Sequence, residues 1–190
     1  MKKKEMKQRS ISVLLAAGIL GFAGPVYAGG VEEPAGYRMD DYRAPVPETL
    51  RGAKVVTTSE AEALWRKKEA VFFDVMPQAP KPANLPAGTI WKEKVREDIP
   101  GSVWLVNVGY GAISAETAEY FRQGLAANTG SDKSRTIVFY CMTDCWMSWN
   151  AAKRALEWGY DSVVWYPLGS DGWESANLPL EENTTYVVND

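Results

Sequence analysis

The side chains best suited to covalent chemistry in this 190-residue chain are its two cysteines, Cys141 and Cys145. They stand four positions apart, and because the chain has no other cysteine, the spacing indicates one site. Two thiols this close can form a disulfide or bind a soft metal ion together. The chain has no histidine, which excludes Ser-His-Asp and Cys-His catalysis, His-ligated zinc and c-type haem attachment.

The cysteine pair has three interpretations. As a structural disulfide it would close a very small loop, which stabilises a fold little. As a redox pair it needs only proximity and a lowered thiol pKa, because thiolate attack at sulfur requires no histidine. As a metal site it suits Cu(I), with Met142 or Met147 as a thioether ligand, whereas zinc would lack ligands. No metal or other cofactor is required by the sequence.

The segments around the cysteines predict a strand, a loop and a helix. Residues 136–140 are β-branched or aromatic, which favours a buried strand that delivers Cys141 to its C-terminal tip. Residues 150–158 have an apolar helical face and end at Gly159, and residues 162–166 form another strand. A loop from Cys141 to the helix therefore holds both thiols.

The preceding segments repeat this alternation. Residues 71–75 are an apolar run interrupted by Asp74, as in a buried parallel strand whose end emerges at the carboxyl edge of the sheet. Residues 59–62 have the spacing of a capping box, and Ser114 is expected to cap a helix over residues 115–127. The pattern predicts an α/β fold with a central parallel sheet covered by helices on both faces and ligands bound at the carboxyl ends of the strands.

The N-terminal part divides into two segments before this domain. Residues 1–28 have the basic, apolar and small-residue regions of a signal peptide cleaved after Ala28, which predicts export to the bacterial periplasm. Residues 29–53 show no periodicity and predict an extended arm, so the folded domain is expected over residues 54–190. Cleavage would leave 16 basic and 23 acidic side chains, a net charge of −7 that disfavours nucleic acids and anionic membranes.

Four prolines between positions 77 and 86 exclude a regular helix or central strand and predict an exposed loop.

A series of short motifs resembles the rhodanese domain over about residues 52–180. In chain order the motifs are Phe73-Asp74-Val75, Ile99-Pro100-Gly101-Ser102, Val138-Phe139-Tyr140-Cys141, Ala151-Ala152, Gly159-Tyr160-Asp161-Ser162-Val163 and Gly172-Trp173. The resemblance implies a single rhodanese-like domain with sulfurtransferase-like chemistry.

A narrower resemblance is to the rhodanese-like CXXCW motif proteins associated with catabolism through pyrroloquinoline quinone (PQQ)-dependent alcohol dehydrogenases. It rests on Tyr37-Arg38-Met39-Asp40-Asp41-Tyr42, Pro100-Gly101-Ser102-Val103-Trp104 and Cys145-Trp146-Met147-Ser148-Trp149-Asn150. Three residues separate the cysteines here, whereas the family label has two. The resemblance implies a periplasmic redox protein or a quinoprotein dehydrogenase as partner, and an association with PQQ.

By similarity to rhodaneses, Cys141 takes the position of the sulfur-carrying cysteine. The redox interpretation of the pair gives Cys145 the role of a resolving thiol. By the same similarity, the loop would form an anion cradle of backbone amides together with the N-terminus of the following helix. The cradle residues are Met142, Thr143, Asp144, Trp146 and Met147, with Asp74 and Trp149 in support. The loop contains no basic residue, and the charge of Asp144 would oppose a bound anion, which predicts weak binding of thiosulfate.

The tryptophans near the thiols have two interpretations. Trp146 and Trp149 either pack in the core or form a platform for an aromatic cofactor such as PQQ or for a partner protein. The leading function is thiol redox or sulfur-carrier chemistry at Cys141 and Cys145 in a quinoprotein alcohol-oxidation system. The alternative is a non-catalytic binding or assembly module for a dehydrogenase or cytochrome, in which a disulfide merely shapes the loop.

Overall fold

The computed structural model describes residues 30–79, 81–92 and 95–188. In this part of the chain, five strands form a parallel sheet in the order β1-β6-β5-β2-β4. The strands are β1 (Lys54–Val55), β2 (Val71–Asp74), β4 (Val103–Trp104), β5 (Ile137–Tyr140) and β6 (Val163–Tyr166). A separate antiparallel pair joins β3 (Arg96–Asp98) to β7 (Glu181–Asn183). The sequence did not predict this second pair.

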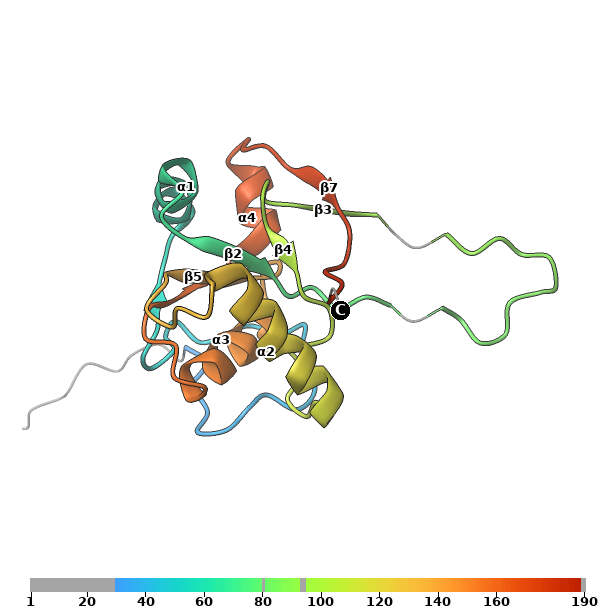
Figure 1. Ribbon diagram of the computed structural model, residues 1–190, viewed down its shortest axis with the longest axis horizontal. Coiled ribbons are helices and arrows are strands. Elements are labelled where there is room, and N and C mark those ends of the chain that lie inside the picture. The colour runs from blue at the N-terminus through green and yellow to red at the C-terminus, as the bar shows by residue number, and fades with distance from the viewer. Residues whose placement is uncertain (1–29, 80, 93–94, 189–190) are drawn as a thin grey trace, which may run out of the picture.

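Helices cover both faces of the parallel sheet (Figure 1). One face packs against α1 (Thr58–Lys67) and α4 (Gly169–Ser175), and the other against α2 (Ala115–Thr129) and α3 (Trp146–Glu157). The side chains of β5 alternate between these layers because successive residues of a strand point to opposite faces. Ile137 and Phe139 lie in the α2 and α3 layer, and Val138 and Tyr140 lie in the other. The expected α/β fold is confirmed.

Two predicted helix starts are wrong. The capping box of α1 is formed by Thr57 and Glu60, because Thr57 has extended backbone and exchanges side-chain and backbone hydrogen bonds with Glu60. The predicted box at residues 59–62 therefore lies two positions too late. Helix α3 begins at Trp146, directly after Cys145, and not at position 150. The earlier start places the second cysteine at the N-terminus of the helix.

The arm at residues 30–53 contains no helix or strand and contacts the domain through side chains, backbone hydrogen bonds and one isolated bridge. The segment between β2 and β3 also has no regular element in its described residues, and residues 81–92 reach away from the body of the fold (Figure 1). The predicted signal peptide at residues 1–28 lies outside the described residues. Among the helices described, none combines the length and apolar character needed to cross a membrane.

Candidate active site

The two cysteines are joined in a disulfide where the sheet meets α3. Cys141 directly follows β5, Cys145 directly precedes α3, and their Cα atoms are 6.3 Å apart. That separation lies in the range that disulfides require, about 4.4 to 6.8 Å. Asp144 has the left-handed backbone conformation, with φ of 54°, and this turns the short loop back toward the helix. The exposed fractions of Cys141 and Cys145 are only 0% and 3%, so the disulfide is buried.

The carbonyl oxygen of Cys141 is held by residues distant in sequence. It accepts hydrogen bonds from the backbone amide and the hydroxyl of Ser170, each at 3.1 Å, and from Nη2 of Arg96 at 3.3 Å. Gly169 precedes Ser170, and a Cβ atom there would lie 2.6 Å from the carbonyl group of Cys141. The close approach therefore requires glycine, and these contacts fix the start of the loop in addition to the disulfide.

Arg96 also forms a buried ion pair with Asp74, the last residue of β2. Its Nε lies 2.5 Å from Oδ2 of Asp74, whose side chain is fully buried. Burial raises the pKa of Asp74, while the guanidinium and the amide of Met76 oppose that shift. Burial by itself would lower the pKa of Arg96, but the attraction of Asp74 outweighs it and the pKa is raised. Arg96 is therefore a permanent cation beside the Cys141 loop, a residue that sequence reasoning missed.

The N-terminal arm covers the other end of the loop. The first amide of α3, that of Trp146, donates to the carbonyl of Tyr42 at 2.9 Å, and Arg43 forms an antiparallel bridge with Cys145. Asn150 anchors the arm because its side-chain amide exchanges two hydrogen bonds of 2.9 Å with the backbone of Arg38. The arm thus occupies the helix terminus that the sequence analysis expected to face an anion.

The loop residues divide between buried and exposed positions. Thr143 donates its amide to the carboxylate of Asp171 at 3.3 Å, so a second amide of the expected cradle already has an anionic partner. Asp144 is exposed, Met142 is partly buried, and Met147 is buried in the layer between α3 and the sheet. These positions leave the loop tip in contact with solvent and its two ends enclosed.

Trp146 and Trp149 are packing residues. Their exposed fractions are 2% and 0%, and their rings meet edge to face at 5.4 Å. Their indole nitrogens donate to the carbonyls of Pro45 and Thr49 in the arm, at 3.2 and 3.1 Å. The two rings offer no exposed platform, so the interpretation as a stacking surface for PQQ or a partner is wrong. They bind the arm to α3 instead.

A cavity of about 540 Å³ opens at the carboxyl edge of the sheet beside the disulfide. Its polar and sulfur-bearing lining includes Met76, Lys92, Arg96, Glu97, Met142, Ser170, Asp171 and Glu174. Three carboxylates against two cations make the lining unfavourable for a free anion. Met76 both lines the cavity and contacts the disulfide, with Sδ 3.4 Å from Sγ of Cys141. The disulfide is therefore one side chain away from the cavity.

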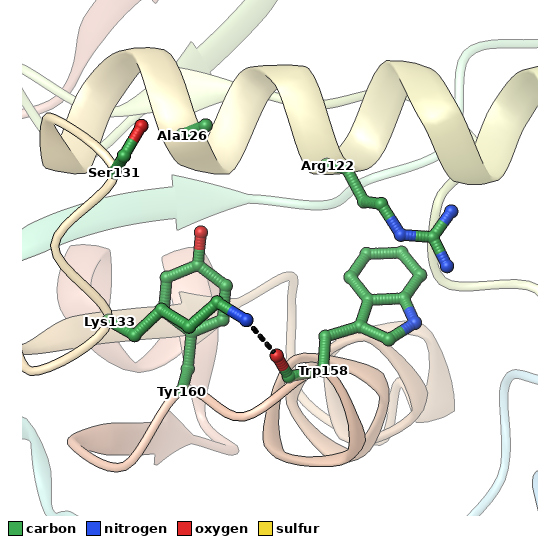
Figure 2. Close-up of a pocket in the computed structure, with 6 residues that line it drawn as sticks. All are labelled: Arg122, Ala126, Ser131, Lys133, Trp158 and Tyr160. Carbon is green, nitrogen blue, oxygen red and sulfur yellow. Dashed lines mark hydrogen bonds between the residues drawn. The ribbon is translucent and has the colours of Figure 1, made fainter.

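A second hollow, of about 350 Å³, lies near the amino ends of β5 and β6 (Figure 2). Its aromatic walls are Trp158 and Tyr160, and its cations are already engaged. Arg122 lies over the ring of Trp158, with 4.2 Å to the ring centre, and Nζ of Lys133 donates to the carbonyl of Trp158 at 2.5 Å. This hollow is at the opposite edge of the sheet from the disulfide and contributes nothing to its chemistry.

Comparison with known proteins identifies the family. Residues 57–176 match the rhodanese-like domain family, which is more than half of the chain. This chain belongs to that family. Among curated proteins, none matches its sequence significantly.

Three solved structures are similar to this rhodanese-like domain at low sequence identity. A thiosulfate sulfurtransferase from Pseudomonas aeruginosa is 18% identical, with a TM-score of 0.47 over 71% of this chain and 21% of the other. The chain thus spans about a fifth of that protein's length. A polysulfide-sulfur transferase homodimer from Wolinella succinogenes is 18% identical, with a TM-score of 0.44 over 70% and 81% of the two chains. A Saccharomyces cerevisiae protein is 19% identical, with a TM-score of 0.39 over 65% and 92%.

Sequence reasoning located the two cysteines and Asp74 but not the groups around them. Arg96 lies 45 positions before Cys141 and follows the proline-rich segment, so no local spacing joins them. Met76 could not be assigned to the site from the sequence, because a methionine that follows a strand has no pattern that distinguishes it from a packing residue. The motifs around Arg38 and Asn150 carried a signal, since both belong to the narrower family resemblance and the structure brings them into contact.

Proposed function

We propose that this rhodanese-like domain is a thiol–disulfide protein whose Cys141 and Cys145 alternate between a disulfide and two thiols. The observation that carries the proposal is the pairing of both cysteines in the loop between β5 and α3, with the Cys141 carbonyl fixed independently by Ser170 and Arg96. A loop held at its start by other contacts can lose and regain the disulfide without losing its shape. Sulfur transfer through Cys141 is the related sulfurtransferase-like activity.

The proposed exchange begins with the reduced pair. The Cys141 thiolate attacks a disulfide of the partner, forms a mixed disulfide and releases one partner thiolate. The Cys145 thiolate then attacks Sγ of Cys141 and releases the second partner thiolate, so that the partner gains two electrons and the pair loses two. The reactant approaches through the cavity and reaches Cys141 when the side chain of Met76 turns aside. No histidine or metal takes part.

We propose that the sulfur-carrier activity is slow with thiosulfate. The amides of Trp146 and Thr143 are engaged by Tyr42 and Asp171, and the guanidinium of Arg96 is engaged by Asp74. An incoming sulfur-donor anion would have to displace these partners. The thiosulfate:cyanide sulfurtransferase assay should therefore show little turnover with the wild-type chain, and Asp171→Asn should raise it by removing the competing carboxylate.

The setting of this chemistry is also a proposal. The signal-like residues 1–28 support export to the periplasm, an oxidising compartment in which a disulfide can persist. The resemblance to the CXXCW motif proteins supports service to a PQQ-dependent alcohol dehydrogenase or a periplasmic redox partner. Expression of the full chain with its leader, followed by fractionation and N-terminal sequencing, tests export and cleavage after Ala28.

The second candidate is a non-catalytic binding module, and the burial of both cysteines favours it. In this case the disulfide only shapes the loop. The partner is contacted by the N-terminal arm and by the proline-rich segment. The reduction potential of the pair separates the two functions, measured by thiol trapping across a glutathione series. A potential well above about −300 mV supports exchange, and a pair that resists reduction below that value supports the structural role.

A trapping variant adds a chemical test. Cys145→Ser should accumulate a mixed disulfide or a stable persulfide on Cys141, because the resolving thiol is absent. Cys141→Ser is the matched control and should accumulate neither, since the nucleophile is missing. Equal recovery of adducts from the two variants, or none from either, would contradict the assigned roles.

A further inference from the structure

We infer that the reduced pair, together with Met76, forms a binding site for Cu(I). The inference goes beyond the proposed exchange reaction and rests on it only in requiring that the disulfide can be reduced. Two thiolates and a thioether are soft ligands, and soft sulfur ligands select Cu(I) over harder cations. The sequence pointed to Met142 or Met147 as the thioether, whereas the structure brings Met76 to the cysteine sulfur.

The position of Met76 carries the argument. Its Sδ lies 3.4 Å from Sγ of Cys141, although 65 residues separate them in the chain. A metal–sulfur bond is about 2.3 Å long in the comparable zinc–thiolate case, so two sulfurs on one ion can be at most about 4.6 Å apart. The observed separation already satisfies that limit. Reduction of the disulfide lets the Cys141 and Cys145 sulfurs move apart, and the ion takes the space between the three sulfurs.

The backbone of Met76 is fixed on both sides, which gives the thioether a defined place. Its amide donates to Oδ1 of Asp74 at 2.8 Å, and its carbonyl accepts from the indole nitrogen of Trp104 at 2.7 Å. Asp74 is itself held by Arg96. The side chain of Met76 therefore projects from a rigid point at the end of β2, as a preorganised ligand should.

A Cu(I) ion held by two thiolates carries a net charge of −1. The guanidinium of Arg96 lies 3.3 Å from the carbonyl oxygen of Cys141, and because it is paired with Asp74, the two side chains together add no net charge beside the site. The cavity, which Met142 also lines, gives an access route to the site. Within the described residues, no group of three or more cysteine, aspartate and glutamate side chains lies close enough together to hold a metal ion.

The chemistry of loading balances without oxidation of the metal. A dithiol reductant supplies two electrons and two protons to the disulfide and becomes a disulfide itself. Cu(I) then replaces the two thiol protons, which pass to the solvent, and accepts the lone pair of the Met76 thioether. Copper enters and stays as Cu(I). Binding should therefore weaken as the pH falls, because protons compete with the metal for both thiolates.

The test is an anaerobic titration of the reduced, desalted protein with Cu(I) in competition with a chromogenic Cu(I) chelator. The expected result is one Cu(I) per chain in the wild type. Met76→Leu should keep the fold and weaken Cu(I) binding at least about tenfold. Losing a residue that only hydrogen-bonds to a metal ligand already weakens binding by about tenfold or more, and Met76 is proposed as a ligand itself. Met142→Leu is the matched control from the same cavity and should bind Cu(I) as the wild type does.

X-ray absorption gives an independent readout, with three sulfur neighbours of copper in the wild type and two in Met76→Leu. Equal affinity of wild type and Met76→Leu, or a loss confined to Met142→Leu, would overturn the assignment. Thiol counting before the titration keeps the two proposals apart. Two trapped thiols without Cu(I) binding refute the copper site alone, and failure of the native disulfide to be reduced refutes both.

Discussion

Reduction of the Cys141–Cys145 disulfide should cost the fold little stability. The bond closes a loop of five residues, and the loop-closure relation gives a stabilisation of about 2 kcal/mol for a loop this short. The Cys141 carbonyl keeps its hydrogen bonds to Ser170 and Arg96 after reduction, and the bridge between Arg43 and Cys145 also remains. The reduced protein is therefore expected to stay folded.

Guanidinium unfolding, followed by tryptophan fluorescence, measures this difference between the oxidised protein and the same protein in dithiothreitol. The double variant Cys141→Ser/Cys145→Ser is the control, and its free energy of unfolding should not respond to the reductant. By linkage, a stabilisation of about 2 kcal/mol makes the folded disulfide harder to reduce than the unfolded one by about 40 mV. A loss of about 5 kcal/mol or more on reduction would refute this reasoning and make the disulfide a structural clip.

Three further changes test the framework around the loop. Burial raises the pKa of Asp98 to about 7, and its Oδ1 has no hydrogen-bond partner. Asp98 therefore binds a proton more tightly in the folded state than in the unfolded state. As the pH rises from 4 to 8, the free energy of unfolding of the wild type should fall by up to about 4 kcal/mol relative to that of Asp98→Asn. Urea unfolding of both proteins at the two pH values measures this difference. Gly169→Ala should destabilise the fold, since the new Cβ would lie 2.6 Å from the carbonyl of Cys141, and thermal melting measures the loss. Arg96→Met should lower the free energy of unfolding by about 3 to 5 kcal/mol, because it leaves Asp74 buried without its partner. Adding Asp74→Asn should recover much of this loss, and a double-mutant cycle of unfolding free energies measures both effects.

The sequence predicted the layers of the fold well because they depend on patterns within short segments. The apolar runs at residues 71–75 and 136–140 became β2 and β5, and Ser114 caps α2 as expected. The β3–β7 pair was missed because its strands are three residues long and highly charged, with no apolar pattern. Their pairing joins segments about 85 residues apart, which no local signal reports.

The proximity of the two cysteines was predictable from the sequence, and the residues that surround them were not. Cysteine chemistry and spacing located Cys141 and Cys145. The contacts of Met76, Arg96 and Ser170 with Cys141 are tertiary, because the carboxyl ends of β2 and β5 meet only once the sheet has formed. The loop itself contains no basic residue, but the structure brings Arg96 of β3 to it.

The arm changes what the loop can stabilise. A persulfide or a bound sulfur donor is an anion and needs several hydrogen-bond donors or a free cation. In this domain Trp146 donates its amide to Tyr42, Thr143 donates to Asp171, and Arg96 faces Asp74. A disulfide is neutral and needs no donors, so the same surroundings that disfavour a persulfide accommodate the bond between the two sulfurs. This difference in charge favours the disulfide over a persulfide as the resting state of the loop.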